Sequence, residues 1–278
     1  MKTLLLPTIK DLISYQKTLN QNSYIGLVPT MGALHEGHLS LIKASKQKDT
    51  HTIVSIFVNP TQFGPNEDFS KYPRDMQKDL RLCEENGVDA VFAPQVSDMY
   101  PNHDEISLNP PKNMGYVYEG FIREGHFNGV LAIVLKLFHL IKPHHAYFGQ
   151  KDAQQLLIIK RMVQDLFLPI QIIACPTQRD ADGLAMSSRN IYLSQEDRKN
   201  ALKIPNALKI ISQAIERGET KCASLIEAGK KVLENIELDY LAICDYNLAP
   251  LEEIRKNASI VLLAAKVGKT RLLDNLWI

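Results

Sequence analysis

The chain has 278 residues, and its 32 Lys and Arg against 31 Asp and Glu give a formal net charge of +1 at pH 7. Nucleic acids and anionic membranes select proteins with a marked excess of basic residues, so this balance gives no case for either as the main partner. With 45% apolar and 23% charged residues, the composition is that of a globular protein and excludes general disorder.

The sequence predicts neither a secretory signal nor a membrane span. The N-terminal apolar run is cut by Pro7, and the longest apolar stretch, residues 130–141, is interrupted by Lys136 and His139. That stretch falls short of the roughly 18 residues that a span requires. The four cysteines contain no C-x-x-C pair, which favours reduced, buried thiols over zinc ligands or disulfides. We expect a cytoplasmic protein.

Short apolar runs typical of strands alternate with amphipathic helical patterns through the first two thirds of the chain. The predicted strands are residues 24–28, 52–58, 90–92, 146–148 and 170–174. The predicted helices are residues 39–48, 75–86, 128–141 and 153–166. Strands that are apolar on both faces and separated by helices indicate a parallel sheet covered on both sides. Ligands of such sheets bind at the carboxyl ends of the strands.

The pattern changes near residue 177. A polar segment precedes two predicted helices and three strand-like runs, at residues 196–217, 222–235, 238–245, 259–267 and 270–275. This order is typical of a compact α+β unit. We therefore expect a Rossmann-like α/β domain over residues 1–176 and a smaller C-terminal α+β domain over residues 177–278.

The first segment that carries chemistry is PTMGALHEGHLSL, directly after the first predicted strand. Gly32 and Gly37 permit a tight turn, and the helix that begins at about Gly37 presents unpaired N–H groups. His35 and His38 project from one side of the helix start if its first turn includes both. This arrangement favours phosphate binding, although capping histidines or a plain connection would leave the same pattern. The H-x-x-H spacing does not match the zinc-protease motif H-E-x-x-H.

The segment FVNPTQFG leaves the second predicted strand. Asn59 and Gln62 flank Pro60, and their amides could bind hydroxyl or carboxylate oxygens of a small substrate. A rigid Asn-Pro turn is the alternative interpretation.

The segment YFGQKDAQQ follows a later strand. Gly149 permits a turn, Lys151 supplies a cation for polyphosphate, and Gln155 would face the same site. Asp152 would cap the next helix or orient Lys151.

The segment RDADGLAMSSRNIYLS lies at the expected domain junction. Ser187, Ser188 and Arg189 place two hydroxyls and a guanidinium on a loop that could close over phosphates. Ser194, with Asp197 three residues later, predicts the start of the next helix.

Together, PTMGALHEGH, FVNPTQFG, YPR, GHFNGV, FGQKD with QQ, DGLAMSSRN and VGKTRLLDN resemble the pantothenate synthetase (pantoate–β-alanine ligase) family in order and spacing. The resemblance runs from about residue 20 to the C-terminus. It implies that pantoate carboxylate attacks the α-phosphorus of ATP, giving pantoyl adenylate and diphosphate. The amine of β-alanine then displaces AMP and forms pantothenate, a precursor of coenzyme A. It also implies Mg²⁺ bound with ATP and a homodimer.

The resemblance also assigns site residues. It places His38 as proton donor or transition-state stabiliser, His35 on the phosphates, and Lys151 and Arg189 among the catalytic cations. Gln62 and Gln155 would bind pantoate, and Gln62 would also meet β-alanine. The ATP-binding residues would be Met31, Gly32, Ala33, Leu34, His35, Glu36, Gly37, His38, Gly149, Gln150, Lys151, Asp152, Gln178, Met186, Ser187, Ser188 and Arg189. Further candidates that line the cleft are Asn59, Tyr72, Arg123 and His126.

The chain departs from the family pattern at Gln150, Ala153, Gln178 and Glu124, and none of these removes a phosphate-binding side chain. Two alternatives stay open. One is an enzyme of the same superfamily that transfers a nucleotide to a phosphorylated alcohol, and the other is a nucleotide-binding regulatory module without catalysis. The pair Gln62 and Gln155 argues against the first.

Overall fold

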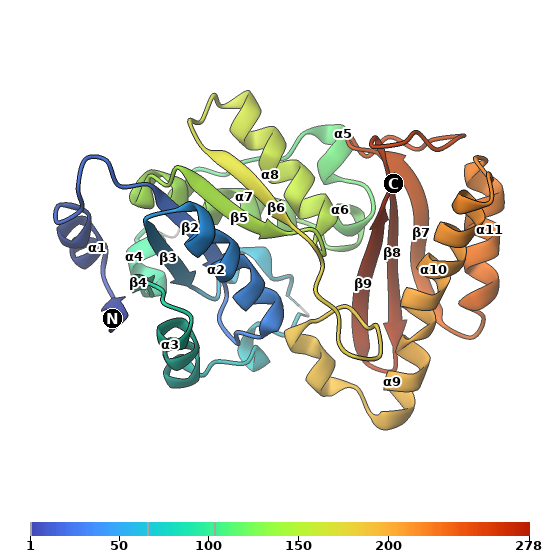
Figure 1. Cartoon of the computed structure of the whole chain (residues 1–278), viewed down its shortest axis with the longest axis horizontal. Coiled ribbons are helices and arrows are strands. Elements are labelled where there is room, and N and C mark those ends of the chain that lie inside the picture. Colours follow the sequence, from blue (N-terminus) through green and yellow to red (C-terminus); the bar gives the residue numbers. More distant parts are fainter. Residues whose placement is uncertain (1, 66, 103) are drawn as a thin grey trace. The chain divides into compact units, whose positions relative to one another are not determined.

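The computed structural model describes residues 2–65, 67–102 and 104–278 (Figure 1). The described chain divides into two compact units. The first comprises Met1–Gln150 and Ile158–Pro176, and the second comprises Lys151–Leu157 and Thr177–Ile278. No helix within the described residues combines the length and the hydropathy that crossing a membrane requires.

The first unit is built on a parallel sheet that has six strands within the described residues, in the order β1-β4-β3-β2-β5-β6. The strands are β1 (Leu4–Leu6), β2 (Ile25–Thr30), β3 (His51–Ile56), β4 (Ala90–Phe92), β5 (His145–Gly149) and β6 (Gln171–Cys175). The chain leaves β2 toward β3 on one side and later returns as β5 on the other. The carboxyl ends of β2 and β5 therefore form the switch point at which ligands of such sheets bind.

Helices connect these strands (Figure 1). The longer ones are α1 (Ile9–Gln16), α2 (Glu36–Lys48), α3 (Met76–Glu85), α7 (His126–Ile141) and α8 (Ala153–Asp165), and the short ones are α4 (Val96–Met99), α5 (Lys112–Gly115) and α6 (Glu119–Ile122). Single 3₁₀ turns occur at Pro60–Gln62 and Phe69–Lys71. The parallel α/β architecture predicted from the sequence is confirmed.

The core of this unit lies on both faces of the sheet. Val28 and Val54 point to the face covered by α2 and α3, where they pack with Ile42 and Cys83. Leu27, the neighbour of Val28 in β2, is also fully buried, because successive side chains of a strand point to opposite faces and α7 packs near β2 on the other side. Burial on both faces explains why these strands are continuous apolar runs.

A buried polar network fixes the carboxyl end of α2. Asp49, which follows the helix, accepts a hydrogen bond from the Tyr147 hydroxyl at 2.6 Å and pairs with Nδ1 of His145. A side chain at Gly26 would lie 2.1 Å from Oγ of Ser45 and 2.2 Å from Asp49, so this strand position has no room for one. The network ties α2 to β5, the strand beside β2.

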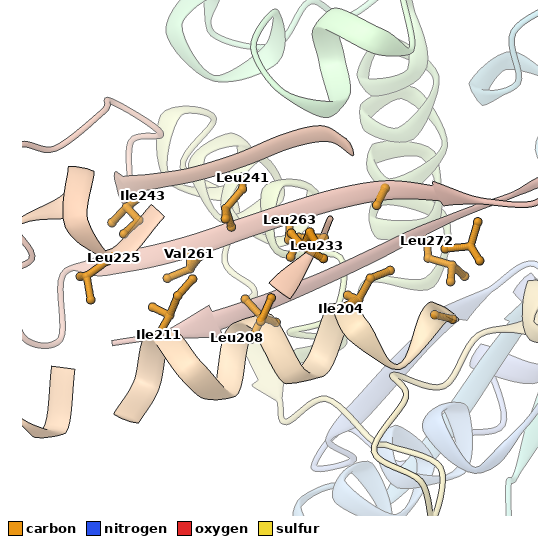
Figure 2. Close-up of a cluster of buried hydrophobic side chains, with 14 of the residues drawn as sticks. Ile204, Leu208, Ile211, Leu225, Leu233, Leu241, Ile243, Val261, Leu263 and Leu272 are labelled. Carbon is orange, nitrogen blue, oxygen red and sulfur yellow. The ribbon is translucent and has the colours of Figure 1, made fainter. Parts of the chain in front are cut away.

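The second unit contains an antiparallel sheet that has three strands within the described residues: β7 (Glu237–Asp245), β8 (Ser259–Val267) and β9 (Thr270–Trp277). Its helices are α9 (Gln195–Ala201), α10 (Lys203–Glu216) and α11 (Cys222–Val232), preceded by a 3₁₀ helix at Ser188–Tyr192. Figure 2 shows Ile204, Leu208 and Ile211 of α10 pointing at the apolar face of this sheet. The predicted α+β architecture is confirmed.

The single helix expected over residues 196–217 is wrong, because α9 ends at Ala201 and α10 begins at Lys203. Pro205 supplies the physical reason. Its nitrogen has no hydrogen to donate to the carbonyl of Ala201, and its ring excludes that carbonyl from a continuous helix. Proline is tolerated in the first turn of α10, where the N–H groups have no partner within the helix.

All four cysteines are buried and carry free thiols, as expected: Cys83, Cys175, Cys222 and Cys244. Burial and, to a smaller extent, the nearby carboxylate of Asp79 raise the pKa of Cys83 to about 12. Burial also raises the pKa of Cys175 and of Cys222. These thiols stay protonated at neutral pH.

Candidate active site

The loop between β2 and α2 has an uncommon backbone. Gly32 and the following Ala33 have φ angles of +82° and +52°, so two consecutive residues occupy the left-handed region. Glycine adopts that region without strain, whereas alanine does so at a cost. The chain then enters α2 with His35 as the N-cap residue and His38 in the first helical turn.

The two histidine rings lie together at the start of α2, with centroids 4.1 Å apart. Nδ1 of His35 accepts a hydrogen bond from the N–H of Gly37 at 3.1 Å, and Nδ1 of His38 accepts from the N–H of His35 at 3.3 Å. A backbone N–H can only donate, so each neutral ring carries its proton on Nε2. The expectation that the two histidines share one side of the helix start is confirmed, although His35 caps the helix from outside it. Two Nε2–H donors at the positive end of a helix suit an anion.

Gln62 lies beside this loop with its amide orientation fixed by Asn59. Asn59 is 1% exposed, and its Nδ2 donates to Oε1 of Gln62 at 3.0 Å and to the carbonyl of Gly129 at 3.1 Å. Because Oε1 of Gln62 is an acceptor in that bond, Nε2 is its donor end, and it lies 3.2 Å from Sδ of Met31. Gln62 thus directs its amide donor toward Met31. The contribution of Asn59 to this site is therefore to orient the amide of Gln62.

Arg123, His126 and Glu67 form a hydrogen-bonded cluster next to Gln62, in which His126 is buried and the other two are partly buried. Arg123 binds the carboxylate of Glu67 through Nε and Nη2, both at 2.7 Å. Nδ1 of His126 lies 2.9 Å from the carbonyl of Gln62, and its Nε2 lies 3.0 Å from Nη1 of Arg123. A carbonyl only accepts and a guanidinium only donates, so the ring is neutral with its proton on Nδ1.

The cluster shifts the pKa of two of its groups. Burial and, to a smaller extent, the neighbouring guanidinium of Arg123 lower the pKa of His126 to about 4, while the hydrogen bond to the carbonyl of Gln62 opposes the shift. Burial alone would raise the pKa of Glu67, but the hydrogen bond and charge of Arg123 outweigh it, and the net pKa is lowered. At neutral pH the cluster therefore holds one ion pair and a neutral imidazole.

Tyr72, also named from the sequence, is 6% exposed and packs its ring against Phe63, with centroids 6.0 Å apart.

At the carboxyl end of β5, the N–H of Gln150 donates to the carbonyl of Cys175 at 2.8 Å. Gly149 thus leaves the sheet beside the β2 loop, because β2 and β5 are neighbours. The first unit brings together Met31, Gln62, Arg123 and His126 from three separate segments.

The second unit contains the other residues named from the sequence. Nζ of Lys151 lies 3.4 Å from Oδ1 of Asp152, which fits the expectation that Asp152 orients the lysine. The carbonyl of Lys151 accepts from Nδ2 of Asn275 in β9 at 2.7 Å. Gln155 lies in the first turns of α8 and is partly exposed.

The segment that carries Met186–Arg189 is anchored by ion pairs at its base. Arg179 binds both carboxylate oxygens of the buried Asp274 at 2.6 and 2.8 Å. Arg198 of α9 binds Asp180 at 2.7 Å and Asp182 at 2.8 Å. These pairs hold a tight turn over residues 179–185 immediately before the proposed phosphate-binding loop.

Within that loop, the N–H of Met186 donates to the carbonyl of Gln178 at 2.9 Å. Oγ of Ser187 accepts from the N–H of Arg189 at 3.3 Å, which caps the short helix that contains Ser188. Ser194 caps α9 through the N–H of Asp197, as predicted. Met186, Ser187, Ser188 and Arg189 are partly exposed.

One group that contacts the loop between β2 and α2 had no signal in the sequence. Asp79 of α3 accepts hydrogen bonds from the N–H groups of Ala33 and Leu34 at 2.9 and 2.8 Å. No sequence motif announces such contacts, because their partners are main-chain atoms about 45 residues away. Within the described residues, no group of three or more His, Cys, Asp or Glu side chains is placed to hold a metal ion.

The chain is similar to known proteins over nearly its whole length. A sequence model described as pantoate-beta-alanine ligase matches residues 5–277. A pantothenate synthetase of Helicobacter pylori (strain Shi470) is 56% identical over 275 residues, which cover 98% of this chain and 99% of the relative.

Solved structures give the same result. A pantothenate synthetase from Thermus thermophilus has a TM-score of 0.93 at 40% identity and covers 99% of each chain. A pantoate-beta-alanine ligase from Francisella tularensis, complexed with beta-gamma ATP and β-alanine, has a TM-score of 0.82 at 37% identity, over 99% of this chain and 97% of that one. With its motifs, fold and near full-length matches in agreement, the chain belongs to the pantoate–β-alanine ligase family.

Proposed function

We propose that this ligase joins pantoate to β-alanine in two steps that consume ATP, supplying pantothenate for coenzyme A synthesis. The observation that carries the proposal is the paired imidazoles at the start of α2 beside the oriented amide of Gln62, in a family whose Francisella tularensis member was crystallised with an ATP compound and β-alanine. A carboxylate is a poor electrophile until it carries a good leaving group, so adenylation must precede amide formation.

In the first step, a carboxylate oxygen of pantoate attacks the α-phosphorus of ATP, and the bond to the bridging oxygen of diphosphate breaks. Residues 31–38 would hold the nucleotide, with Nε2–H of His35 and of His38 donating to phosphate oxygens as negative charge moves to the leaving diphosphate. The positive end of α2 acts in the same direction. Gly149, Gln150, Lys151, Asp152, Gln178 and Met186–Arg189 would complete the ATP site.

In the second step, the neutral amine of β-alanine attacks the acyl carbon of pantoyl adenylate, AMP leaves with the bonding electrons, and the nitrogen releases one proton to solvent as the amide forms. The donor end of the Gln62 amide suits the carboxylate and hydroxyl oxygens of pantoate, and it could also meet the carboxylate of β-alanine. Gln155 would bind pantoate from α8. Positioning of this kind converts a slow bimolecular reaction into one between neighbours.

Magnesium would enter with ATP as part of the substrate. Mg²⁺ prefers oxygen ligands and commonly takes them from phosphates and water, so a site made only of protein ligands is not required.

We assign residues 1–176 to ATP and pantoate binding and residues 177–278 to a lid that carries Arg189. A homodimer in the cytoplasm is the assembly and location that we propose.

A coupled assay tests the reaction. AMP should form only when pantoate, β-alanine and Mg-ATP are all present, and diphosphate release should depend on pantoate. Steady AMP formation without pantoate would mean that the acceptor is another molecule.

A variant of the proposed donor tests the site. His38→Ala should slow pantoate-dependent diphosphate release by about 100-fold or more, because it removes a donor that faces developing charge. The matched control is His139→Ala, which removes an exposed imidazole from α7 and should leave the rate unchanged. Adenylation by His38→Ala at the parent rate would contradict the role that we assign to it.

A further inference from the structure

The carboxylate of Asp79 lies directly beneath the loop that begins the proposed ATP site. Asp79 is on α3 and is only 1% exposed. Its Oδ2 accepts from the N–H of Ala33 at 2.9 Å, and its Oδ1 accepts from the N–H of Leu34 at 2.8 Å. Each carboxylate oxygen therefore binds one of two successive main-chain N–H groups.

The backbone of the loop explains why it needs such a partner. The N–H groups of Ala33 and Leu34 point to the same side, because both reach one carboxylate, and successive N–H groups that converge in this way form a concave site for an anion. In this protein the anion is supplied from within, by Asp79. An ionised carboxylate forms stronger hydrogen bonds than a neutral acceptor, and such bonds offset the unfavourable conformation of Ala33.

The position of Leu34 controls the residues that follow it. Leu34 directly precedes His35, whose ring caps α2 and whose N–H binds the ring of His38. The space around the loop is also closed, since a Cβ on Gly32 would lie 2.9 Å from Oδ2 of Asp79 and 3.1 Å from Ile56. A shift of the loop away from Asp79 would therefore move both imidazoles.

We propose that Asp79 is a positioning residue for the ligase reaction: its carboxylate holds the loop of residues 31–35 in the shape that receives ATP and aims His35 and His38. This inference rests on the function proposed above. Asp79 touches no substrate in this role, and it acts only through the main chain of the loop.

The ionisation state of Asp79 fits that role. Burial raises the pKa of Asp79, while the hydrogen bonds from Leu34 and Ala33 oppose the shift. The charged groups that act on it are Asp75 and Lys78 of its own helix. Both of its oxygens accept from main-chain N–H groups, which is the geometry of an ionised carboxylate.

Asp79→Asn tests the proposal, because the amide keeps the size of the carboxylate but turns one acceptor into a donor that faces an N–H. We expect the dissociation constant for ATP to rise about 10- to 100-fold and diphosphate release to slow, since the loop loses one bond and weakens the other. The control is Asp75→Asn on the same helix. Asp75 is exposed and caps α3, and asparagine caps equally well, so this variant should bind ATP as the parent does.

A second measurement follows the loop amides directly and does not depend on activity. In a ¹⁵N-labelled parent protein, the amide signals of Ala33 and Leu34 should both titrate on acidification, with one shared midpoint above the ordinary pKa of an aspartate. In Asp79→Asn the same amides should exchange with solvent at least tenfold faster. Titrating only the parent keeps the proposal testable if that variant fails to fold.

Two results would overturn the proposal. One is a folded Asp79→Asn protein whose ATP affinity and loop amide exchange match those of the parent. The other is a parent protein in which the two amides do not titrate together. If the amides and ATP binding respond as expected but AMP formation does not depend on pantoate, the ligase function fails and the positioning role of Asp79 for ATP stands.

Discussion

Acidification should weaken this fold through His126. Its pKa of about 4 in the folded chain compares with the ordinary value of 6.5. Between these values the unfolded state binds more protons than the folded state, so stability is present above pH 6.5 and is lost as the pH falls toward 4. A shift of 2.5 units corresponds to about 3 kcal/mol at full protonation.

The size of the effect follows from the contacts. A proton on Nε2 of His126 would face the guanidinium of Arg123, which has only donors to offer at 3.0 Å. The ring is 8% exposed, so water screens this repulsion little. Between pH 6.5 and pH 4.5 this single group should remove about 2 kcal/mol of unfolding free energy.

Urea unfolding at several pH values, followed by circular dichroism, measures this loss. The comparison is with His126→Gln, in which an amide can donate to the carbonyl of Gln62 and accept from Arg123 without titrating. Its unfolding free energy should fall by about 2 kcal/mol less than that of the parent over the same pH range. His139→Gln, an exposed change of the same kind, should behave as the parent does.

An NMR titration of the His126 ring measures its pKa in the folded chain directly. A midpoint near 6.5 would refute the reasoning, because it would mean that the ring is hydrated or that Arg123 does not face it. An equal pH dependence in the parent and in His126→Gln would do the same.

Two further changes test the two units separately. Gly129→Ala should raise the KM for pantoate and lower the free energy of unfolding by about 1–3 kcal/mol, because the new Cβ would lie 2.3 Å from the carbonyl oxygen of Thr61 and must displace the turn that holds Gln62. Steady-state kinetics measures the first effect, and thermal unfolding measures the second. Arg179→Lys should lower the stability of the second unit by about 3 kcal/mol, because the buried carboxylate of Asp274 loses its paired donors. Urea unfolding followed by the fluorescence of Trp277 measures this loss. A midpoint within error of that of the parent would contradict the role of this ion pair.

Local patterns in the sequence were sufficient for most of the fold. The runs that form β2, β3, β4 and β5 are mainly buried on both faces, so their apolar character is visible without knowledge of their partners. Strand β1 was missed, because Leu4–Leu6 is short, two of its three side chains are exposed, and its neighbour in the sheet is the distant strand β4. Pro205 carried the information that α9 and α10 are separate, but the amphipathic pattern across it favoured one helix.

The candidate site shows where such reasoning stops. The histidines, Gln62 and Lys151 were visible because each lies just after a predicted strand or at a helix start. The role of Asp79 was not visible in the sequence, because its partners are main-chain N–H groups of a distant loop. The sequence pattern around it indicates only an amphipathic helix. The bond from Asn59 that orients Gln62 likewise depends on a side-chain rotamer, which no spacing rule predicts.

The buried thiols have a practical consequence. Because all four native cysteines are enclosed, and three of them also have raised pKa values, the parent chain should react slowly with thiol reagents. A cysteine introduced at an exposed position in each unit, for example Lys78→Cys and Lys209→Cys, would then be the site that a fluorescent dye labels. Energy transfer between the two dyes would report, in a single molecule and without removing any native cysteine, how the separation of the units responds when ATP is added.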